Sequence, residues 1–380
     1  MRKKIPLCKP SFTAAEASAA ARAVKSGDVV GHGSIGAAAE AQLAADLGAR
    51  RVLLTTSGSH ALELAVAVMG LGPGDEVIVP AFTFPSVANC LLRQKAVPVF
   101  ADVLKDTLNL DPADVERRIT RRTKAILPVH YAGVASDMAA LGALAKARGL
   151  LLLEDAAHCV GATYRGKPLG TIGKAGCYSF HATKNITCGE GGAFLTDDLA
   201  LAEKAEIFRE KGTNRSAFMR GEIKKYTWVS EGSSYVLSDI LAAVLMEQWK
   251  KLAEINSRRR RIYEIYVDGL SGAAASGKVF LPVIPKDCVS SYHLFHLLMP
   301  SMKLRDRCLD ALRAQGIGAT FHYQSLHNSP FGRKALGCRE RMPVSEMASD
   351  CLLRLPLYPD LSRADAAFIC GELNKALARL

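Results

Sequence analysis

The first half of the chain alternates between short apolar runs and longer segments in which apolar residues recur at helical spacing. The short runs predict buried strands at about 51–54, 76–80, 97–101, 124–129, 150–154, 177–180 and 192–196. The longer segments predict helices at about 13–26, 35–47, 59–69, 112–119, 137–148 and 199–211. Thr13 is the expected N-cap of the first helix, and Gly27 and Gly149 are expected to end two helices. Alternating strands and helices indicate an α/β fold with a doubly wound, mostly parallel sheet.

The pattern changes in the second half. Segment 212–235 is long, polar and rich in aromatic residues, and loops of this length inside a compact domain usually have a function. A long helix at about 238–270, a strand at 292–298, a helix at 303–315 and a strand at 318–323 follow. We therefore expect a large domain over residues 1–250 and a smaller C-terminal α+β domain over residues 251–380, as suits a chain of 380 residues.

Composition excludes several classes of protein. An apolar share of 49% excludes a disordered chain, and no apolar run is long enough to span a membrane. The N-terminus has positive charge but lacks the apolar core of a signal peptide, so we expect a cytoplasmic protein without a membrane partner. The 10 cysteines form no CxxC pair, and no histidines stand at zinc spacing, which indicates reduced thiols and no metal site.

The chain is basic, with a formal net charge of +12. Such a charge suits nucleic acid, and equally an anionic substrate such as a sugar nucleotide. No nucleic-acid-binding motif with interleaved aromatic residues is present, so we do not expect a nucleic-acid partner. The densest basic run, residues 258–261, lies in a helical pattern and is interpreted as a solvated helix face.

An acid and a lysine in the middle of the chain suggest a particular chemistry. Asp155 follows the apolar run 150–153, so it should lie at the carboxyl end of a buried parallel strand, where α/β sheets bind ligands. Lys184 comes shortly before the glycine-rich turn at 189–192. Pyridoxal 5′-phosphate (PLP) needs a lysine for covalent attachment and an acid beside its pyridinium nitrogen. The alternatives are a helix N-cap for Asp155 and a structural role for Lys184. The order of acid, lysine and glycines resembles that of fold-type I PLP enzymes.

The resemblance extends to a family. Residues 154–198, 128–133 and 74–84 resemble the DegT-type nucleotide-sugar aminotransferases, and the similarity runs from Ile5 to about Leu357. Within that family, segments 206–239 and 321–323 are most similar to the dTDP-4-amino-4,6-dideoxygalactose transaminases. The resemblance implies a fold-type I PLP-dependent transferase.

The resemblance also implies a set of cofactor contacts. Lys184 and Asp155 would be the catalytic residues. The expected cofactor-binding residues are Ser57, Gly58, Ser59, Phe82, Asp155, His158, Ser179 and Lys184. The turn and helix start at 57–59 offer backbone N–H groups to the phosphate, as helix N-termini do. Phe82 would stack on the ring and His158 would lie by its phenolic oxygen, whereas the alternatives are an ordinary core aromatic and a core histidine.

The side that binds the sugar nucleotide is less well defined. The expected substrate-binding residues are His181, Arg215, Arg220, Tyr226, Trp228, His322 and Tyr323. Arginine forks suit the oxygens of a pyrophosphate, although solvated surface charge is the alternative for this basic loop. Many relatives carry an asparagine where this chain has Val236, and that asparagine reaches the partner subunit's cofactor phosphate. Ser233 or Ser234 could replace it, and a homodimer is still expected.

The expected function is transfer of the amine of L-glutamate to C4 of dTDP-4-keto-6-deoxy-D-glucose, which gives dTDP-4-amino-4,6-dideoxy-D-galactose for a surface polysaccharide. The alternative substrates are a UDP-linked keto pentose, a UDP-linked acetamido sugar or a 3-keto sugar. A PLP-dependent sugar dehydratase is disfavoured, because those relatives carry histidine where this chain has Lys184. A nucleic-acid-binding protein or a non-catalytic regulator is disfavoured by the intact Lys184 and Asp155.

Overall fold

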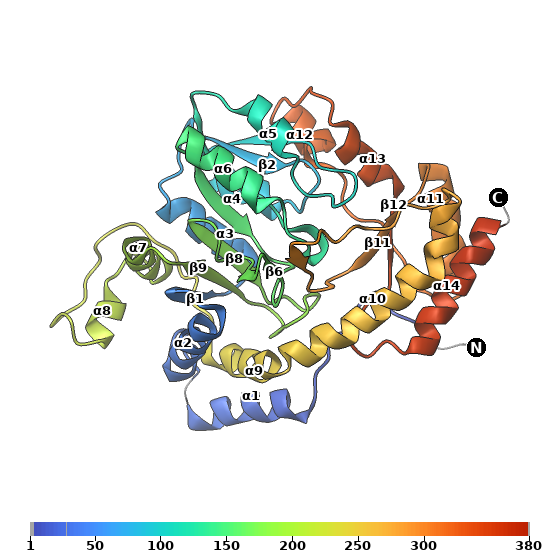
Figure 1. Cartoon of the computed structure of the whole chain (residues 1–380). Helices are drawn as coiled ribbons and strands as arrows, with labels where there is room; N and C mark the ends of the chain where they lie inside the picture. Colours follow the sequence, from blue (N-terminus) through green and yellow to red (C-terminus); the bar gives the residue numbers. More distant parts are fainter. Residues whose placement is uncertain (1–3, 28, 379–380) are drawn as a thin grey trace.

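A central sheet covered by helices on both faces forms the larger part of the protein (Figure 1). The computed structural model describes residues 4–27 and 29–378. Within them, a seven-stranded sheet has the order β1-β9-β8-β5-β4-β2-β3. Its strands are β1 (Arg51–Thr55), β2 (Glu76–Pro80), β3 (Val97–Ala101), β4 (Thr123–Ile126), β5 (Leu151–Asp155), β8 (Ala175–Ser179) and β9 (Gly192–Thr196). Only β9 runs antiparallel to its neighbours, so the expected mostly parallel sheet is confirmed.

The helices of this part follow the predicted pattern with two additions. They are α1 (Ala14–Ser26), α2 (Ser34–Leu47), α3 (Gly58–Val68), α4 (Ser86–Arg93), α5 (Pro112–Arg118), α6 (Met138–Arg148), α7 (Leu199–Arg209), α8 (Arg215–Met219) and α9 (Asp239–Lys250). Helix α4 and the short α8 were not predicted from the sequence. Thr13 caps α1 together with Glu16 in a capping box. Gly27 and Gly149 end their helices in the left-handed conformation, as expected.

Alternate residues of the strands enter different cores. Val77 and Val79 of β2 pack with α3 and α4 on one face, whereas Ile78 packs with α5 and α6 on the other. Near β1, β8 and β9 the second face is covered by α2 and α9. Because both faces are covered, the central strands are buried almost throughout and read as apolar runs in the sequence.

The C-terminal part has its own apolar core. Its main elements are α10 (Leu252–Ala275), β11 (Phe295–Leu298), α11 (Met302–Ala314), α12 (Pro330–Lys334), α13 (Pro343–Cys351), β12 (Leu352–Leu355) and α14 (Arg363–Ala378). The core contains Ile5 and residues from Ile262 onward. A small three-stranded sheet of β6 (Thr163–Tyr164), β7 (Lys167–Pro168) and β10 (Cys288–Val289) joins segments from the two halves. The boundary at 250/251 stays a prediction.

Three expectations for the second half were wrong. The long helix predicted at 238–270 is two helices, because the chain leaves helical geometry at Lys251. The strand predicted at 318–323 does not form, since Thr320 makes only an isolated bridge with Arg354. The basic run at 258–261 is not wholly a solvated face. Arg259 is buried, and its Nη1 donates to the carbonyls of His293 and Leu357.

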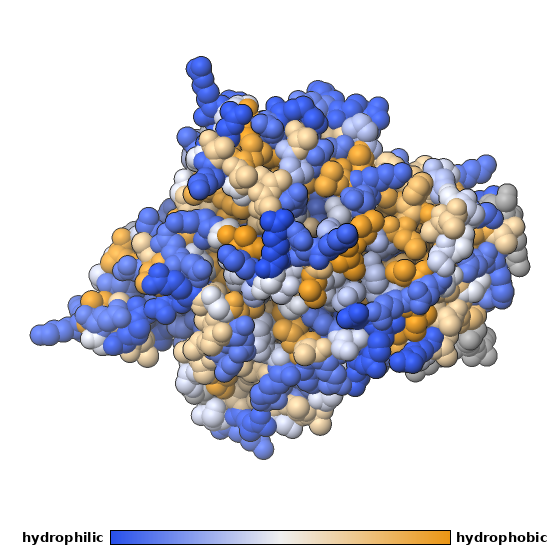
Figure 2. Space-filling model, in the orientation of Figure 1, coloured by the Kyte–Doolittle hydropathy of each residue, from blue (hydrophilic) through white to orange (hydrophobic). Residues whose placement is uncertain are grey.

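Segment 212–235 projects from the body of the protein beside α7 (Figure 1). It carries several exposed apolar side chains, namely Phe218, Met219, Tyr226, Trp228 and Val229. Figure 2 shows apolar residues among hydrophilic ones on this projection, at the left of the view. An exposed group of this kind on a protruding segment is typical of an interaction surface.

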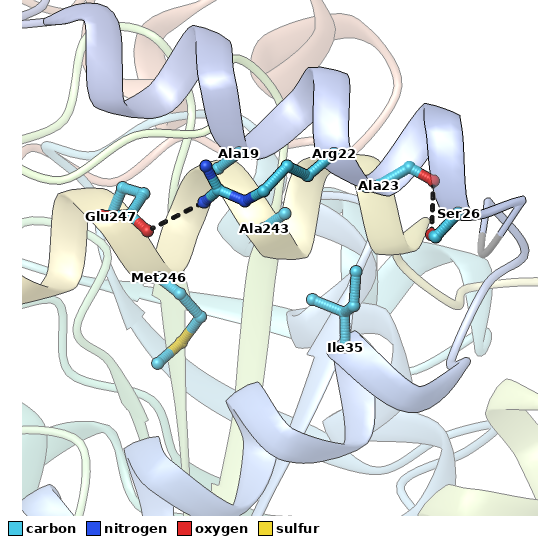
Figure 3. Close-up of a pocket in the computed structure, with 8 residues that line it drawn as sticks. All are labelled: Ala19, Arg22, Ala23, Ser26, Ile35, Ala243, Met246 and Glu247. Carbon is cyan, nitrogen blue, oxygen red and sulfur yellow. Dashed lines mark hydrogen bonds and ion pairs between the residues drawn. The ribbon is translucent and has the colours of Figure 1, made fainter.

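A shallow hollow lies between α1, α2 and α9 (Figure 3). Arg22 and Glu247 form an ion pair there, with Nη2 and Oε1 3.7 Å apart. None of the predicted site residues lines this hollow, so it is separate from the site described below. Across residues 4–27 and 29–378, no helix combines the length and apolar character that crossing a bilayer requires.

Candidate active site

The predicted acid and lysine meet at the carboxyl ends of two neighbouring parallel strands. Asp155 is the last residue of β5, and it pairs in register with Cys177 of β8. Lys184 lies in the turn that follows β8, where its backbone N–H donates to the carbonyl of His181 at 2.8 Å. The register of β5 and β8 therefore brings the two residues to the same edge of the sheet.

Burial shifts the pKa values of both groups. Burial raises the pKa of Asp155, against the opposing effects of the Ala157 amide, which donates to Oδ1 at 3.0 Å, and of the Lys184 charge. Burial lowers the pKa of Lys184 to about 8, although Asp155 opposes the shift. No ion pair joins the two among the residues that the structure describes. Their charges interact without a direct bond, so each side chain can serve a third group.

Helix α3 begins against the end of β8. Ser57 is its N-cap, and the Ser57 hydroxyl accepts from the backbone N–H of His60 at 3.1 Å. A Cβ added at Gly58 would lie only 2.8 Å from the Cβ of Ser179, so glycine allows this close approach. The hydroxyls of Ser59 and Ser86 are 2.6 Å apart. The helix start thus combines free backbone N–H groups with several hydroxyls, the donor set that an anion requires.

His158 is held in one tautomer. Its Nδ1 accepts from the backbone N–H of Ala132 at 3.3 Å, so the ring proton resides on Nε2. Burial, with the charge of Lys184, lowers the pKa of His158 well below its usual value and keeps the ring neutral. The ring stacks on His293 at 4.2 Å, and His293 Nδ1 lies 2.8 Å from Asn185 Oδ1. His158 can therefore donate one hydrogen bond from Nε2.

An aromatic wall faces this group. Phe82 is buried, and its ring centroid lies 5.5 Å from that of Tyr131 and 5.5 Å from that of Tyr323. The Tyr131 hydroxyl is 2.8 Å from Nδ1 of His322, whose ring stacks on that of Tyr323. The structure thus brings together Phe82, His322 and Tyr323, three predicted site residues from distant parts of the sequence.

The remaining predicted substrate residues form their contacts with their own neighbours in the chain and not with the aromatic wall. Arg220 forms ion pairs with Glu206 and Glu222, and Arg215 pairs with Glu210 at 3.4 Å. Tyr226 packs on Phe218, and Trp228, which is 75% exposed, forms a backbone bridge with Thr213. His181 is partly exposed, and its Nδ1 lies 2.9 Å from Thr183 Oγ1.

The structure also shows residues that sequence reasoning did not assign to the site. Tyr131, His293 and Asn185 contact predicted site residues directly. Tyr131 could have been identified from the sequence, because it lies in the run 128–133 that resembles the DegT-type family. Val236 forms a backbone bridge with Thr55, and its side chain packs against Gly31.

These features fit PLP. Asp155 offers a carboxylate to the site, and the start of α3 offers a phosphate cradle. Burial lowers the pKa of Lys184 to about 8, so its neutral amine forms at lower pH than that of an ordinary lysine. His158 offers one N–H donor for an oxygen on the ring. The fold and this donor set define a PLP-dependent enzyme of fold-type I.

The family follows from comparison with known proteins. Residues 11–374 match the DegT/DnrJ/EryC1/StrS aminotransferase family, and the chain belongs to that family. It is therefore a PLP-dependent aminotransferase.

Solved structures of the same fold agree. The chain is similar to S. venezuelae DesV, solved in complex with a ketimine intermediate, at 33% identity and a TM-score of 0.90, over 100% of both chains. It is similar to Helicobacter pylori PseC, an aminotransferase involved in the biosynthesis of pseudoaminic acid, at 26% identity and a TM-score of 0.92, over 100% of both chains. It is also similar to the PLP form of Streptococcus pneumoniae Spr1654, described as a sugar aminotransferase, at 27% identity and a TM-score of 0.91, over 99% of both chains.

Proposed function

We propose that the protein transfers the amine of L-glutamate to C4 of dTDP-4-keto-6-deoxy-D-glucose and so forms dTDP-4-amino-4,6-dideoxy-D-galactose for a surface polysaccharide. The observation that carries the chemistry is the convergence of Lys184, Asp155 and the start of α3 at one edge of the sheet. The choice of sugar rests on the sequence resemblance of segments 206–239 and 321–323.

In this proposal Lys184 and Asp155 are the catalytic residues. The bound cofactor would withdraw electrons from the carbon that carries the amine. Lys184 Nζ accepts a proton from the α-carbon of the donor and later delivers a proton to the sugar carbon that receives the amine. The Asp155 carboxylate keeps the proton on the pyridine nitrogen, because an adjacent negative charge favours the protonated ring.

The other residues hold and orient. Backbone N–H groups of Gly58 and Ser59 and the hydroxyl of Ser179 bind the phosphate, beside the Ser57 cap. His158 donates from Nε2 to the phenolic oxygen. Phe82 lies in the packed aromatic wall, and its proposed role is to stack on one face of the cofactor ring.

The sugar nucleotide is proposed to bind with help from a second copy of the chain. Four predicted substrate residues lie on the projecting segment and make their side-chain or backbone contacts with that segment and with the end of α7, namely Arg215, Arg220, Tyr226 and Trp228. Exposed apolar groups on this segment support its docking on a homodimer partner, where it would reach the partner's site. His181, His322 and Tyr323 would complete the substrate pocket in the same chain as Lys184.

A second candidate is amination of a different keto sugar. PseC takes part in the biosynthesis of pseudoaminic acid, and its overall structure matches this chain as well as DesV does. The overall fold therefore does not favour one sugar over another, and the dTDP-linked substrate is supported by the sequence resemblance of segments 206–239 and 321–323.

A panel of sugars tests the proposal. The purified protein is incubated with L-glutamate and, separately, dTDP- and UDP-linked 4-keto and 3-keto sugars, and the products are identified by mass and NMR. We expect the dTDP-linked 4-keto-6-deoxy sugar to react fastest and its new C4 amine to be axial. Preference for a UDP-linked sugar, or amination at C3, would replace the substrate and leave the aminotransferase chemistry in place.

A further inference from the structure

Asn185, the residue that follows Lys184, lies at the centre of a buried polar cluster. Its Nδ2 donates to the carbonyl of Ser291 at 2.6 Å and to Oδ1 of Asn256 at 2.8 Å, and its Oδ1 lies 2.8 Å from Nδ1 of His293. Ser291, His293 and Asn256 all belong to the C-terminal part. The cluster therefore ties the backbone next to Lys184 to that part of the chain.

The hydrogen bonds of this cluster fix the positions of its protons. The carbonyl of Ser291 can only accept, so the Asn185 amide presents Nδ2 to it and Oδ1 to His293. Burial lowers the pKa of His293 well below its usual value and keeps the ring neutral, and its one proton must reside on Nδ1, opposite the amide oxygen. In His158 the proton resides on Nε2, because Nδ1 accepts from the Ala132 N–H. The two neighbouring histidines are thus held in different tautomers.

The same segment of the C-terminal part also contacts His158. The ring of His293 stacks on that of His158, with the centroids 4.2 Å apart and the planes inclined by 25°. The hydroxyl of Ser291 donates to the carbonyl of His158 at 2.5 Å. Gly133 allows this approach, because a Cβ there would clash with the Oγ of Ser291. Residues 291–293 thus hold His158 through both its ring and its backbone.

The segment 291–293 is itself held in a strained conformation. Tyr292 has a φ of 53°, in the left-handed region that residues other than glycine rarely adopt. The carbonyl of His293 accepts from Nη1 of the buried Arg259 at 2.9 Å, which fixes the end of the segment. Backbone strain persists only where surrounding contacts impose it, and it concentrates at functional sites. The conformation of Tyr292 therefore supports a functional role for the residues on either side of it.

We propose that His293 is a positioning residue of the active site, which directs the Nε2–H of His158 by stacking on its ring and, through Asn185, fixes the turn that carries Lys184. The inference rests on the proposed contact between His158 and the phenolic oxygen of PLP. His293 acts through its neighbours and needs no contact of its own with the cofactor or a substrate. Because His293 comes from the C-terminal part, the site is complete only when that part is docked on the sheet.

The pH titration of the PLP absorbance tests the effect on His158 without any substrate. A donor to the phenolic oxygen stabilises its negative form, so it lowers the midpoint of the titration. His158→Phe removes the donor and should raise the midpoint by about one to two pH units, the value of a hydrogen bond to a charged group. His293→Asn keeps a donor for Asn185 but loses the stacked ring, and it should raise the midpoint by at least about 0.5 units. Besides burial, the groups that influence the pKa of His158 are retained in His293→Asn, namely Lys184, His322 and Arg354.

The hydrogen bond to Asn185 is tested separately. His293→Phe keeps a stacked ring but leaves Oδ1 of Asn185 without its donor, and Asn185→Ala removes the same bond from the other side, so the result does not depend on one variant that folds. Each should slow the half-reaction with saturating L-glutamate about 10-fold or more, because a displaced Lys184 transfers protons poorly. The Kd for glutamate should change less than about 3-fold, since neither variant alters a proposed contact with that substrate. His293→Phe should leave the absorbance midpoint at the wild-type value.

Tyr266→Phe is the control for stability alone, because the Tyr266 hydroxyl donates to the Pro356 carbonyl at 2.6 Å within the C-terminal core. It should lower the unfolding temperature and leave the absorbance midpoint and the half-reaction rate unchanged. If the His293 variants also change only the unfolding temperature, the cluster is a structural contact and the inference is wrong. A wild-type midpoint in His158→Phe would overturn it as well. If the wild type does not aminate the dTDP-linked sugar, the proposed substrate is wrong, whereas the absorbance titration, which needs no sugar, still decides the role of His293.

Discussion

Gly58 and Ser179 approach so closely that a Cβ added at Gly58 would lie 2.8 Å from the Cβ and 3.2 Å from the Oγ of Ser179. The first residue of α3 therefore packs against the last residue of β8, and Lys184 lies in the turn that follows β8. The phosphate cradle and the lysine are therefore fixed to each other by backbone packing, and a small change at this contact should affect cofactor binding.

The first prediction concerns that contact. Gly58→Ala should weaken PLP binding at least about 10-fold, because the new methyl group must push α3 away from β8. The double variant Gly58→Ala with Ser179→Gly should recover part of the affinity, since it removes the opposing Cβ. Gly142→Ala on α6 is the control, because a Cβ there meets nothing within 4 Å. The affinity of each of the three variants for PLP is measured by absorbance titration. An unchanged affinity in Gly58→Ala would show that the start of α3 is not the phosphate site.

The second prediction concerns pH. Lys184 must be neutral to accept a proton, and its pKa is lowered to about 8. The rate of the half-reaction with saturating L-glutamate should therefore rise as the pH rises through about 8 and then level off. Arg354→Gln should move this rise to higher pH, because the charge of Arg354 helps to lower the pKa of Lys184. A rate that is flat between pH 6 and 10, on the order of two units on each side of that value, would contradict the role of Lys184 as base.

The third prediction concerns the acid. Asp155→Asn should retain PLP but lower kcat by about 100-fold or more, with a much smaller change in KM, because the carboxylate acts mainly in the transition state. The amide can still accept from the Ala157 N–H, so the local structure should persist. Asp287→Asn, which alters a surface ion pair with Arg165, should leave both constants unchanged. Near-normal turnover in Asp155→Asn would refute the assignment.

The fourth prediction concerns the projecting segment. Arg215→Ala should raise KM for the sugar nucleotide far more than KM for glutamate, since only the first substrate carries a pyrophosphate. Lys204→Ala on α7, an exposed basic residue nearby, is the control.

Mixed dimers show which subunit Arg215 serves. When Lys184→Ala and Arg215→Ala chains are combined, one site of each mixed dimer contains an intact lysine and the partner's intact arginine. If the segment reaches across, that site should have the wild-type KM for the sugar nucleotide. A mixture that behaves like Arg215→Ala alone would place the segment in its own subunit's site.

Much of the fold could be predicted because its strands are buried on both faces. The predicted ranges 76–80 and 192–196 coincide with β2 and β9, which are buried throughout and are mostly apolar. The range 97–101 coincides with the edge strand β3, which is less buried. The segment expected as a strand at 318–323 contains Thr320 and His322 among its apolar residues, and in the structure it makes only an isolated bridge, between Thr320 and Arg354. The break at Lys251 is marked by no proline or glycine, so the local sequence does not reveal it.

The site was predictable only where the sequence order itself carries the signal. Asp155 ends a strand and Lys184 precedes a glycine-rich turn, so local pattern was enough to select them. The His158–His293 stack and the contact between the Tyr131 hydroxyl and His322 each join residues far apart in the chain. The local sequence around each of these residues does not reveal the residue that it contacts, because the contacts form only when the large part and the C-terminal part pack together.

The proposed chemistry requires that Lys184 be the residue that carries PLP. The purified protein should be yellow, and borohydride should fix the cofactor to one peptide, the one that contains Lys184, as shown by mass spectrometry. Lys184→Ala should lose this labelling while Lys174→Ala, whose side chain pairs with Asp198 on the surface, retains it. Labelling of any other lysine in the wild-type protein would contradict the account.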